Sequence, residues 1–244
     1  MNKNLIHNRF AKCLDSYDNN AKIQKRMAEK LFCYIENKHP KKILEIGCGT
    51  GFLTQIINKN LVFEKYIAID LVENCDVFIS RINPNIKFLV ADIENFIKEN
   101  NEHFDLIISN ASLQWVENFE NVINILKSRI TPEGEFVFST FGKENFREIY
   151  HITGTSLNYF STNELQNRFP NSLIESEIHI MAFDNPKEVL RHLQLTGVNA
   201  IENTSWTKKD LINFENEYKN ICSKRPTLTY NPIYVKFPQN RYNV

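Results

Sequence analysis

The chain has 244 residues, enough for one sizeable domain, and its 42% apolar and 24% charged residues are ordinary for a soluble globular protein. Its 29 basic and 29 acidic side chains cancel, so overall charge gives no reason to expect nucleic acid or an anionic membrane as a partner. No apolar run reaches the length of a signal peptide core or a membrane span, and the five scattered cysteines contain no CxxC pair. We therefore expect a cytoplasmic protein with reduced thiols and no metal site.

From residue 41 onward, short apolar runs alternate with amphipathic segments. Each run is nearly continuous and of strand length, as in parallel strands that are buried on both faces. The clearest helical period between the runs extends from Phe119 to Ile130. Strand and helix in series predict an α/β fold with a doubly wound, mostly parallel sheet. The expected strands are Lys42–Ile46, Tyr66–Asp70, Lys87–Val90, Leu106–Ser109 and Phe136–Thr140.

The segments on either side of this core have a different character. Residues 18–36 place an apolar side chain at every fourth position, which predicts an amphipathic helix before the first strand. Residues 143–175 are rich in aromatic side chains and contain a capping-box pattern at Ser161 and Glu164. Both additions are candidates for a lid over the carboxyl edge of the sheet.

Further strands and helices are expected toward the end of the chain. A strand is predicted at Ile178–Phe183, and helices are predicted to begin near Asn185 and Thr207. A final strand is predicted over Leu228–Phe237, in which Pro232 indicates an edge position or a bulge. We expect one domain over 1–244, made of an N-terminal helical cap (1–40), a core (41–142), a lid (143–175) and C-terminal strands and helices (176–244).

Three of the seven glycines, Gly47, Gly49 and Gly51, fall within the stretch LEIGCGTGFL between the first strand and the next helix. Glycines cluster at such a turn when the backbone must approach a ligand closely or adopt positive φ. Cys48 in this turn could be read as a nucleophile, but no histidine is near it in sequence, and a small side chain that fills a tight turn is the simpler interpretation. The core at 41–142 is therefore expected to bind a cofactor.

The ends of the next strands predict which cofactor this is, because ligands of open α/β sheets bind at the carboxyl edge. Asp70, followed by Leu71, ends the second strand, where a carboxylate can accept hydrogen bonds from both hydroxyls of a ribose. Asp92 and Ile93 follow the third strand, beside the expected place of an adenine, and Asn110 follows the fourth.

The spacing of the glycines separates two nucleotide-binding classes. Dinucleotide-binding folds favour G-x-G-x-x-G, with helix amides directed at a pyrophosphate. This chain has G-x-G-x-G preceded by Glu45, and an acid so close would repel a pyrophosphate. It would suit a ligand that carries an ammonium and a sulfonium group, as S-adenosylmethionine does.

The stretch EIGCGTG, then Asp70, then ADIE resembles the seven-stranded, Rossmann-like S-adenosylmethionine-dependent methyltransferases across about residues 40–140. The flanking segments resemble the malonyl-[acyl-carrier protein] O-methyltransferases of biotin synthesis, and the likeness covers almost the whole chain. One departure is Asn231, where the family often has a histidine. The segments that carry this likeness are RFAKCLDSYDNNAKIQKRMA, SNASLQWV, FSTFGKENFREI, EVLRHLQLTGVNA and LTYNPIYV.

This resemblance implies transfer of a methyl group to the free carboxylate of malonyl-acyl carrier protein. It implies that Tyr17 and Gln24 close over the methionine end of the cofactor and the reacting methyl, with simple packing as the alternative. Tyr17 and Arg147 would position the substrate, and Arg147 would guide the malonyl carboxylate unless it is a surface charge. Trp115 would line the substrate pocket or belong to the core, and His192 is expected to be structural. The carboxylate is already ionised at neutral pH, so no general base is expected.

The resemblance also implies an acidic carrier protein as partner. A local basic patch on the predicted N-terminal helix could contact it, or could be an ordinary solvated face, and we expect a monomer. Its members are Lys22, Lys25, Arg26 and Lys30. The alternatives are a methyltransferase for another small carboxylic acid, such as an aconitate-like substrate, and a cofactor-binding regulator without catalysis; the glycine spacing and Glu45 disfavour a dehydrogenase.

Overall fold

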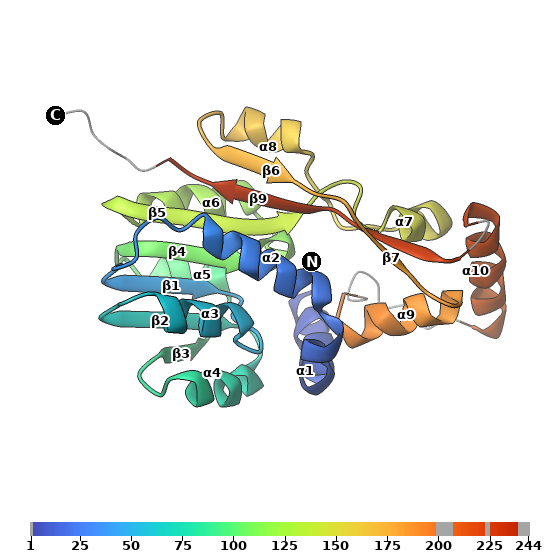
Figure 1. Ribbon diagram of the computed structural model, residues 1–244, viewed down its shortest axis with the longest axis horizontal. Helices are drawn as coiled ribbons and strands as arrows, with labels where there is room; N and C mark the ends of the chain where they lie inside the picture. The colour runs from blue at the N-terminus through green and yellow to red at the C-terminus, as the bar shows by residue number, and fades with distance from the viewer. Residues whose placement is uncertain (1, 199–206, 223–224, 239–244) are drawn as a thin grey trace.

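A seven-stranded sheet forms the centre of the computed structural model, which describes residues 2–198, 207–222 and 225–238 (Figure 1). The strands lie in the order β3-β2-β1-β4-β5-β9-β6, and only β9 runs antiparallel to its two neighbours. The predicted doubly wound, mostly parallel sheet is therefore confirmed. The bounds are β1 Lys42–Ile46, β2 Lys65–Asp70, β3 Lys87–Val90, β4 Phe104–Asn110, β5 Ile130–Phe141, β6 Leu173–Ser176 and β9 Pro232–Lys236.

Helices cover both faces of this sheet and bury the apolar side chains that alternate along its strands. Ile43 of β1 packs with residues of α2 and α3, whereas Leu44 packs with residues of α5 and α6 on the opposite face. This two-sided burial explains the continuous apolar runs of the central strands. The helices are α1 Lys3–Asn20, α2 Lys22–Cys33, α3 Phe52–Asn60, α4 Asp76–Ile82, α5 Ile93–Glu99, α6 Phe119–Ser128, α7 Arg147–Thr153, α8 Thr162–Arg168, α9 Pro186–Leu195 and α10 Lys208–Ile221.

The N-terminal cap consists of two helices where the sequence predicted one over 18–36. α2 forms the central part of that prediction, and Ala21 separates it from α1, which was not predicted as a helix. α1 lies beyond the carboxyl ends of the strands, at the right-hand end of the sheet in Figure 1. The cap therefore reaches the edge at which the predicted binding residues meet.

The prediction of one final strand over Leu228–Phe237 is wrong. The chain forms β8 (Thr227–Tyr230) and β9, which are separated at Asn231. β8 pairs with β7 (His179–Ala182) in a separate two-stranded sheet, whereas β9 lies between β5 and β6. Of the two alternatives inferred from Pro232, an edge position or a bulge, the edge position is wrong, because Pro232 is the first residue of an inner strand, where a missing N–H is tolerated.

The segment 143–175 folds as α7, α8 and most of β6. The capping box at the start of α8 is present, since the Ser161 side chain accepts the Glu164 N–H and Glu164 returns a bond to the Ser161 N–H. The starts of α9 at Asn185 and α10 at Thr207 are also capped as predicted. None of the described helices is long and apolar enough to cross a membrane. The last two residues of the family-like segment EVLRHLQLTGVNA lie outside the described residues.

Candidate cofactor and substrate site

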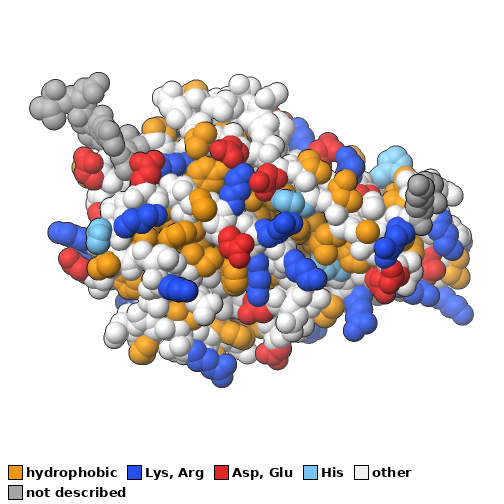
Figure 2. Space-filling view, viewed as in Figure 1, with side chains coloured by type: hydrophobic (Ala, Val, Ile, Leu, Met, Phe, Trp, Pro, Cys, Tyr) orange, Lys and Arg blue, Asp and Glu red, His pale blue; other side chains and the backbone are white. Residues whose placement is uncertain are grey.

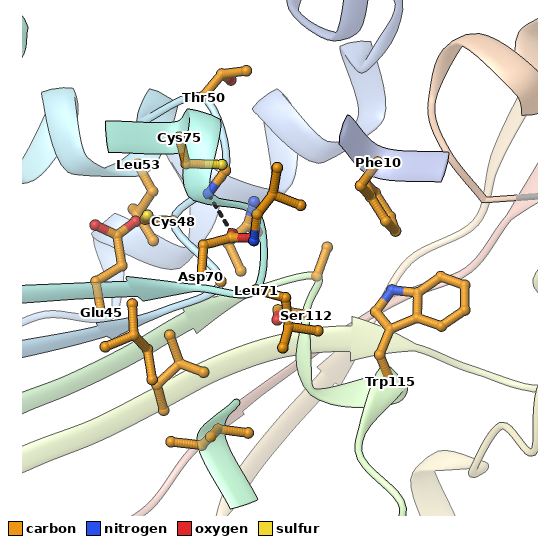
Figure 3. Close-up of a pocket in the computed structure, with 18 of the residues that line it drawn as sticks. Phe10, Glu45, Cys48, Thr50, Leu53, Asp70, Leu71, Cys75, Ser112 and Trp115 are labelled. Atoms are coloured by element: carbon orange, nitrogen blue, oxygen red, sulfur yellow. Dashed lines mark hydrogen bonds between the residues drawn. The ribbon is translucent and has the colours of Figure 1, made fainter. Parts of the chain in front are cut away.

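A cavity, here called the main cavity, lies at the carboxyl edge of the central strands beneath α1. Its walls come from α1, the start of α2, the turn after β1, the end of β2, the start of α5 and the 3₁₀ turn Leu113–Trp115 after β4. Figure 3 shows Glu45 and Asp70 toward one end and Phe10 and Trp115 toward the other. Of the residues predicted to bind cofactor or substrate, those that line it are Tyr17, Gln24, Glu45, Gly47, Gly49, Asp70, Leu71, Asp92, Ile93, Asn110 and Trp115.

The three glycines of the first turn all have left-handed backbone, with φ of 71° at Gly47, 52° at Gly49 and 80° at Gly51. A Cβ on Gly47 would lie 2.1 Å from the Ser112 hydroxyl oxygen, so this glycine permits close packing against the turn after β4. A Cβ on Gly49 would meet no atom within 4 Å. Since Gly49 lines the main cavity, its missing side chain leaves space for a ligand.

Asp70, at the end of β2, is oriented by the backbone around it. Its Oδ2 accepts the Gly49 N–H at 2.9 Å and its Oδ1 accepts the Val72 N–H at 3.0 Å. Burial raises the pKa of Asp70, and these two N–H groups oppose that shift. The Leu71 N–H and the Cys75 thiol also favour the ionised form, so the group lines the cavity as an oriented carboxylate, the type of acceptor that ribose hydroxyls require.

Glu45 is buried at the end of β1, with 1% of its surface exposed. Its Oε2 accepts hydrogen bonds from the Thr54 hydroxyl at 2.6 Å and the Tyr66 hydroxyl at 2.5 Å. Desolvation raises the pKa of Glu45 to about 7, although both hydroxyls favour the ionised form. A cation bound in the cavity would stabilise this carboxylate further.

Asp92 follows β3 and caps α5. Its Oδ1 accepts the Glu94 N–H at 2.7 Å, while Oδ2 lies 2.6 Å from the ammonium of Lys3, which also contacts Glu94 at 2.5 Å. Asp92 and the adjacent Ile93 line the cavity as expected. The ion pair with Lys3, which ties the start of α1 to this wall, was not predicted.

Asn110 connects the end of β4 with the N-terminal cap. Its Nδ2 donates to the Gln24 carbonyl oxygen at 3.0 Å, and its Oδ1 accepts the Ser139 hydroxyl at 2.7 Å. Tyr17 and Gln24 thereby reach the same cavity from α1 and α2. Burial raises the pKa of Tyr17, so its phenol stays protonated and can donate a hydrogen bond.

The aromatic end of the main cavity is formed by Trp115 and by Phe10 of α1. Their rings meet edge to face, with centroids 5.8 Å apart at 83°, and Trp115 is only 9% exposed. Trp115 is thus both a cavity wall and a packed residue. The α1 residues Ile6, Phe10 and Leu14, which also line this cavity, were missed, although their spacing of four positions was a readable helical signal.

Arg147 does not line the main cavity. It is the first residue of α7, its side chain is 51% exposed, and its guanidinium lies 3.4 Å from the carboxylate of Glu144. The geometry therefore gives no support to the predicted contact of Arg147 with a substrate carboxylate.

The segment that was expected to overhang the cofactor reaches a second cavity. This second cavity, of about 330 Å³, is lined by residues 158–160, by Thr140 and Phe141 at the end of β5, and by residues around Val116. Val116 also lines the main cavity, so the two cavities adjoin. The cover of the main cavity is α1 rather than the segment 143–175.

The predicted basic patch is partly neutralised. Lys30 contacts Glu177 at 2.8 Å and Glu175 at 3.0 Å, and Lys25 lies 3.9 Å from Asp18. Lys22 and Arg26 are exposed and have no ion-pair partner among the described residues. Figure 2 likewise shows Lys and Arg side chains interspersed with Asp and Glu side chains over much of this face.

Cys48 and His192 are residue types that can carry other chemistry, but both have structural environments. Cys48 is buried, and desolvation raises the pKa of its thiol well above the ordinary value, so it is not an activated nucleophile. His192 is buried with its Nε2 2.6 Å from the Tyr230 hydroxyl, and desolvation lowers its pKa to about 4. The described residues contain no group of His, Cys, Asp and Glu side chains suited to a metal ion.

The main cavity has an excess of acidic side chains. Asp18, Asp70 and three other carboxylates line it, namely Glu45, Asp92 and Glu94, whereas Lys25 and His7 are the basic residues of its lining. Such a lining favours a ligand with positive charge and disfavours a pyrophosphate. The arrangement can hold a ribose at Asp70 and a cationic group near Glu45.

Comparison with known proteins identifies related sequences whose similarity includes the residues of the main cavity. The methyltransferase domain family matches residues 6–172. The chain is 37% identical to the malonyl-[acyl-carrier protein] O-methyltransferase of Calditerrivibrio nitroreducens, over 96% of each chain. It is 36% identical to that of Chlorobium luteolum, over 95% of this chain and 94% of the other, and 33% identical to that of Acinetobacter baylyi, over 96% of each.

Solved structures share the fold at much lower identity. A protein of Bacillus halodurans C-125 assigned as a methyltransferase superposes with a TM-score of 0.62 at 12% identity, over 86% of this chain and 96% of that chain. The YcgJ protein of Bacillus subtilis superposes with a TM-score of 0.59 at 10% identity, over 86% and 97%.

Proposed function

Because the chain belongs to the family of malonyl-[acyl-carrier protein] O-methyltransferases, we propose that it transfers a methyl group from S-adenosylmethionine to the free carboxylate of malonyl-acyl carrier protein. The product is the malonyl methyl ester on the carrier, which begins the pimeloyl chain of biotin synthesis. The cytoplasm as the site of action and a monomeric state are further parts of this proposal.

The observation that carries the proposal is the acidic lining of the main cavity around a glycine turn. Five carboxylates against Lys25 and His7 suit the ammonium and sulfonium groups of S-adenosylmethionine. We assign the ribose hydroxyls to Asp70, the adenine to the Asp92–Ile93 wall and the ammonium to Glu45. The open space at Gly49 receives the part of the cofactor that crosses the turn.

When bound, S-adenosylmethionine supplies a methyl group that is already activated by its sulfonium. A malonyl carboxylate is ionised at neutral pH, so the protein has to align it and remove its water rather than deprotonate it. Phe10 and Trp115 exclude water at the aromatic end of the cavity. The protonated phenol of Tyr17 can donate one hydrogen bond to the carboxylate and leave its other oxygen free to attack.

The carrier protein would meet the outside of the cap. Lys22 and Arg26, the exposed members of the basic patch, are the cations that we assign to this contact.

The test is intact-mass analysis of malonyl-loaded acyl carrier protein after incubation with the enzyme and S-adenosylmethionine. The expected result is a gain of one methyl group that is lost on mild ester hydrolysis, with acetyl-loaded carrier as the unreactive control because it lacks the carboxylate. Methylation of a lysine or cysteine of the carrier, or of an aconitate-like free acid in preference to the thioester, would contradict the proposal.

A further inference from the structure

The carboxylate of Glu45 is held from one side. Both of its described donors, the hydroxyls of Thr54 and Tyr66, bind the same oxygen, Oε2. Oε1 accepts no hydrogen bond from the described residues, although the side chain is almost fully buried and lines the main cavity. The result is an oriented carboxylate with one oxygen left for a ligand.

The other buried glutamates of the described chain are bound differently. Glu135 accepts backbone N–H groups on both oxygens and pairs with Lys236 at 3.0 Å. Glu148 accepts Thr229 and Thr227 hydroxyls on Oε1 and the Thr229 N–H on Oε2. Buried polar groups ordinarily have hydrogen-bond partners in this way. Glu45 Oε1 differs because no described residue donates to it, which leaves it able to bind a ligand.

The charged surroundings of Glu45 do not supply that partner. Asp70 of β2 is the neighbouring carboxylate, and the titratable Cys48 and Tyr66 also face it from the turn and from β2. Across the cavity, Asp18 and Lys25 line the wall formed by α1 and α2, and Lys25 is itself near Asp18. With desolvation and Asp70 both opposing ionisation, the two hydroxyls are the protein groups that favour the charged form.

We propose that Tyr66 and Thr54 are positioning residues, which hold Glu45 by its Oε2 and direct its Oε1 toward the ammonium group of the cofactor's methionine end. This inference rests on the proposed function, because it requires a ligand with an ammonium group in the main cavity. Neither residue touches the cofactor; Thr54 on α3 and Tyr66 on β2 act through the shared oxygen.

The test is calorimetric titration of Tyr66→Phe at pH 7 with three ligands. S-adenosylmethionine and S-adenosylhomocysteine carry the ammonium group, whereas 5′-methylthioadenosine has the same nucleoside and lacks the amino-acid end. The Kd of the first two should rise about tenfold, as expected for loss of one hydrogen bond to a charged group, and that of 5′-methylthioadenosine should stay within about twofold. Tyr218→Phe is the matched control, since this buried hydroxyl donates to the Thr227 carbonyl oxygen at 2.5 Å, away from the cavity, and should change none of the three.

A second readout is the number of protons released on binding, measured in two buffers of different ionisation enthalpy. Loss of the Tyr66 hydroxyl raises the pKa of Glu45, so more protons should leave when the ammonium binds at pH 7. Thr54→Val should act in the same direction and Thr54→Ser should restore the parent values.

Equal weakening of all three ligands, or unchanged proton release, would overturn the inference and leave the proposed function standing. If the parent protein binds 5′-methylthioadenosine as tightly as S-adenosylmethionine, the amino-acid end of the cofactor adds no affinity. The inferred roles of Tyr66 and Thr54 would then be excluded. Failure of the parent protein to bind S-adenosylmethionine would instead contradict the proposed function itself.

Discussion

Each end of the central sheet buries a glutamate, and the two carboxylates differ in their hydrogen-bond and ion-pair partners. Near the amino edge, Glu135 of β5 is matched by the Glu36 and Asn37 N–H groups and by the ammonium of Lys236. At the carboxyl edge, Glu45 accepts hydrogen bonds from two hydroxyls and has no cationic partner among the residues that the structure describes. The first arrangement is complete and stabilises the fold, whereas the second is incomplete and costs stability until a positively charged ligand arrives. From this difference we infer that Glu135 is a structural acid and that Glu45 is a binding acid.

The largest expected effect belongs to the structural acid. Glu135→Gln removes the buried carboxylate that pairs with the Lys236 ammonium. This loss should lower the free energy of unfolding by about 3 kcal/mol. Urea denaturation measures this loss, and calorimetry should find the affinity for S-adenosylmethionine unchanged. A weaker affinity for S-adenosylmethionine in the folded variant would contradict a purely structural role for Glu135.

Glu45→Gln should have the opposite effect on stability. The pKa of Glu45 in the folded protein is raised to about 7 from the ordinary 4.5, so the folded state keeps a proton that the unfolded chain releases between these values. The free energy of unfolding therefore falls as pH rises through this window, by up to about 3 kcal/mol, and the loss is complete above pH 7.

The variant lacks this loss, so without cofactor it should be more stable than the parent at pH 8 and nearly equal to it at pH 4.5. Thermal unfolding at the two pH values checks the prediction, and calorimetry should show that S-adenosylmethionine binds more weakly. Parallel pH profiles for variant and parent would mean that Glu45 is not the titrating group.

Asp70 belongs with Glu45 on the binding side of the comparison. Asp70→Ala should weaken S-adenosylmethionine binding by about 1–3 kcal/mol, because the ribose hydroxyls would lose their acceptor. Asp76→Ala, on an exposed position of α4, is the control and should leave affinity unchanged. Equal affinities of Asp70→Ala and the parent would exclude the ribose assignment.

The cations of the cap extend the comparison to the outer surface. Lys22→Glu with Arg26→Glu should raise the KM for malonyl-acyl carrier protein about threefold to tenfold and leave the KM for a small malonyl thioester unchanged, since a small thioester lacks the acidic protein surface expected of the carrier. Lys87→Glu with Lys98→Glu, both exposed on β3 and α5, carries the same charge change elsewhere. If both double variants behave alike, the effect is one of net charge.

The smallest effect is expected for Arg147→Ala. As an exposed residue paired with Glu144, Arg147 should change turnover by less than about threefold. A tenfold loss of turnover with unchanged affinity for S-adenosylmethionine would show that α7 moves toward the substrate and would restore the role first inferred from sequence.

The binding half of the molecule could be predicted from the sequence because its signals are local. Buried parallel strands leave continuous apolar runs, and the turn after β1 places glycines at fixed positions, so Asp70 and Asn110 could be assigned to one edge. The ion pair between Lys3 and Asp92 could not, since it joins residues 89 positions apart.

The position of Arg147 depends on tertiary contacts that no local pattern shows. The Phe146 N–H donates to the Thr229 carbonyl oxygen at 2.7 Å, and Glu148 binds both the N–H and the hydroxyl of Thr229, which fixes α7 against β8. The break between β8 and β9 has a similar origin: the Gly142 N–H donates to the Asn231 carbonyl oxygen at 2.8 Å, so the strand is divided by a partner far away in the sequence.

The helix that covers the main cavity has a consequence for the rate of turnover. α1 is held to the cofactor wall by Lys3 with Asp92 and Glu94, and by His7 with Glu73 at 2.7 Å. Because α1 covers the main cavity, we expect the release of spent cofactor to require that these contacts open. Because these ion pairs are partly exposed, salt screens them, and the dissociation rate of S-adenosylhomocysteine should increase with ionic strength. On this expectation, the N-terminal helix limits the rate of product release in addition to forming a wall of the site.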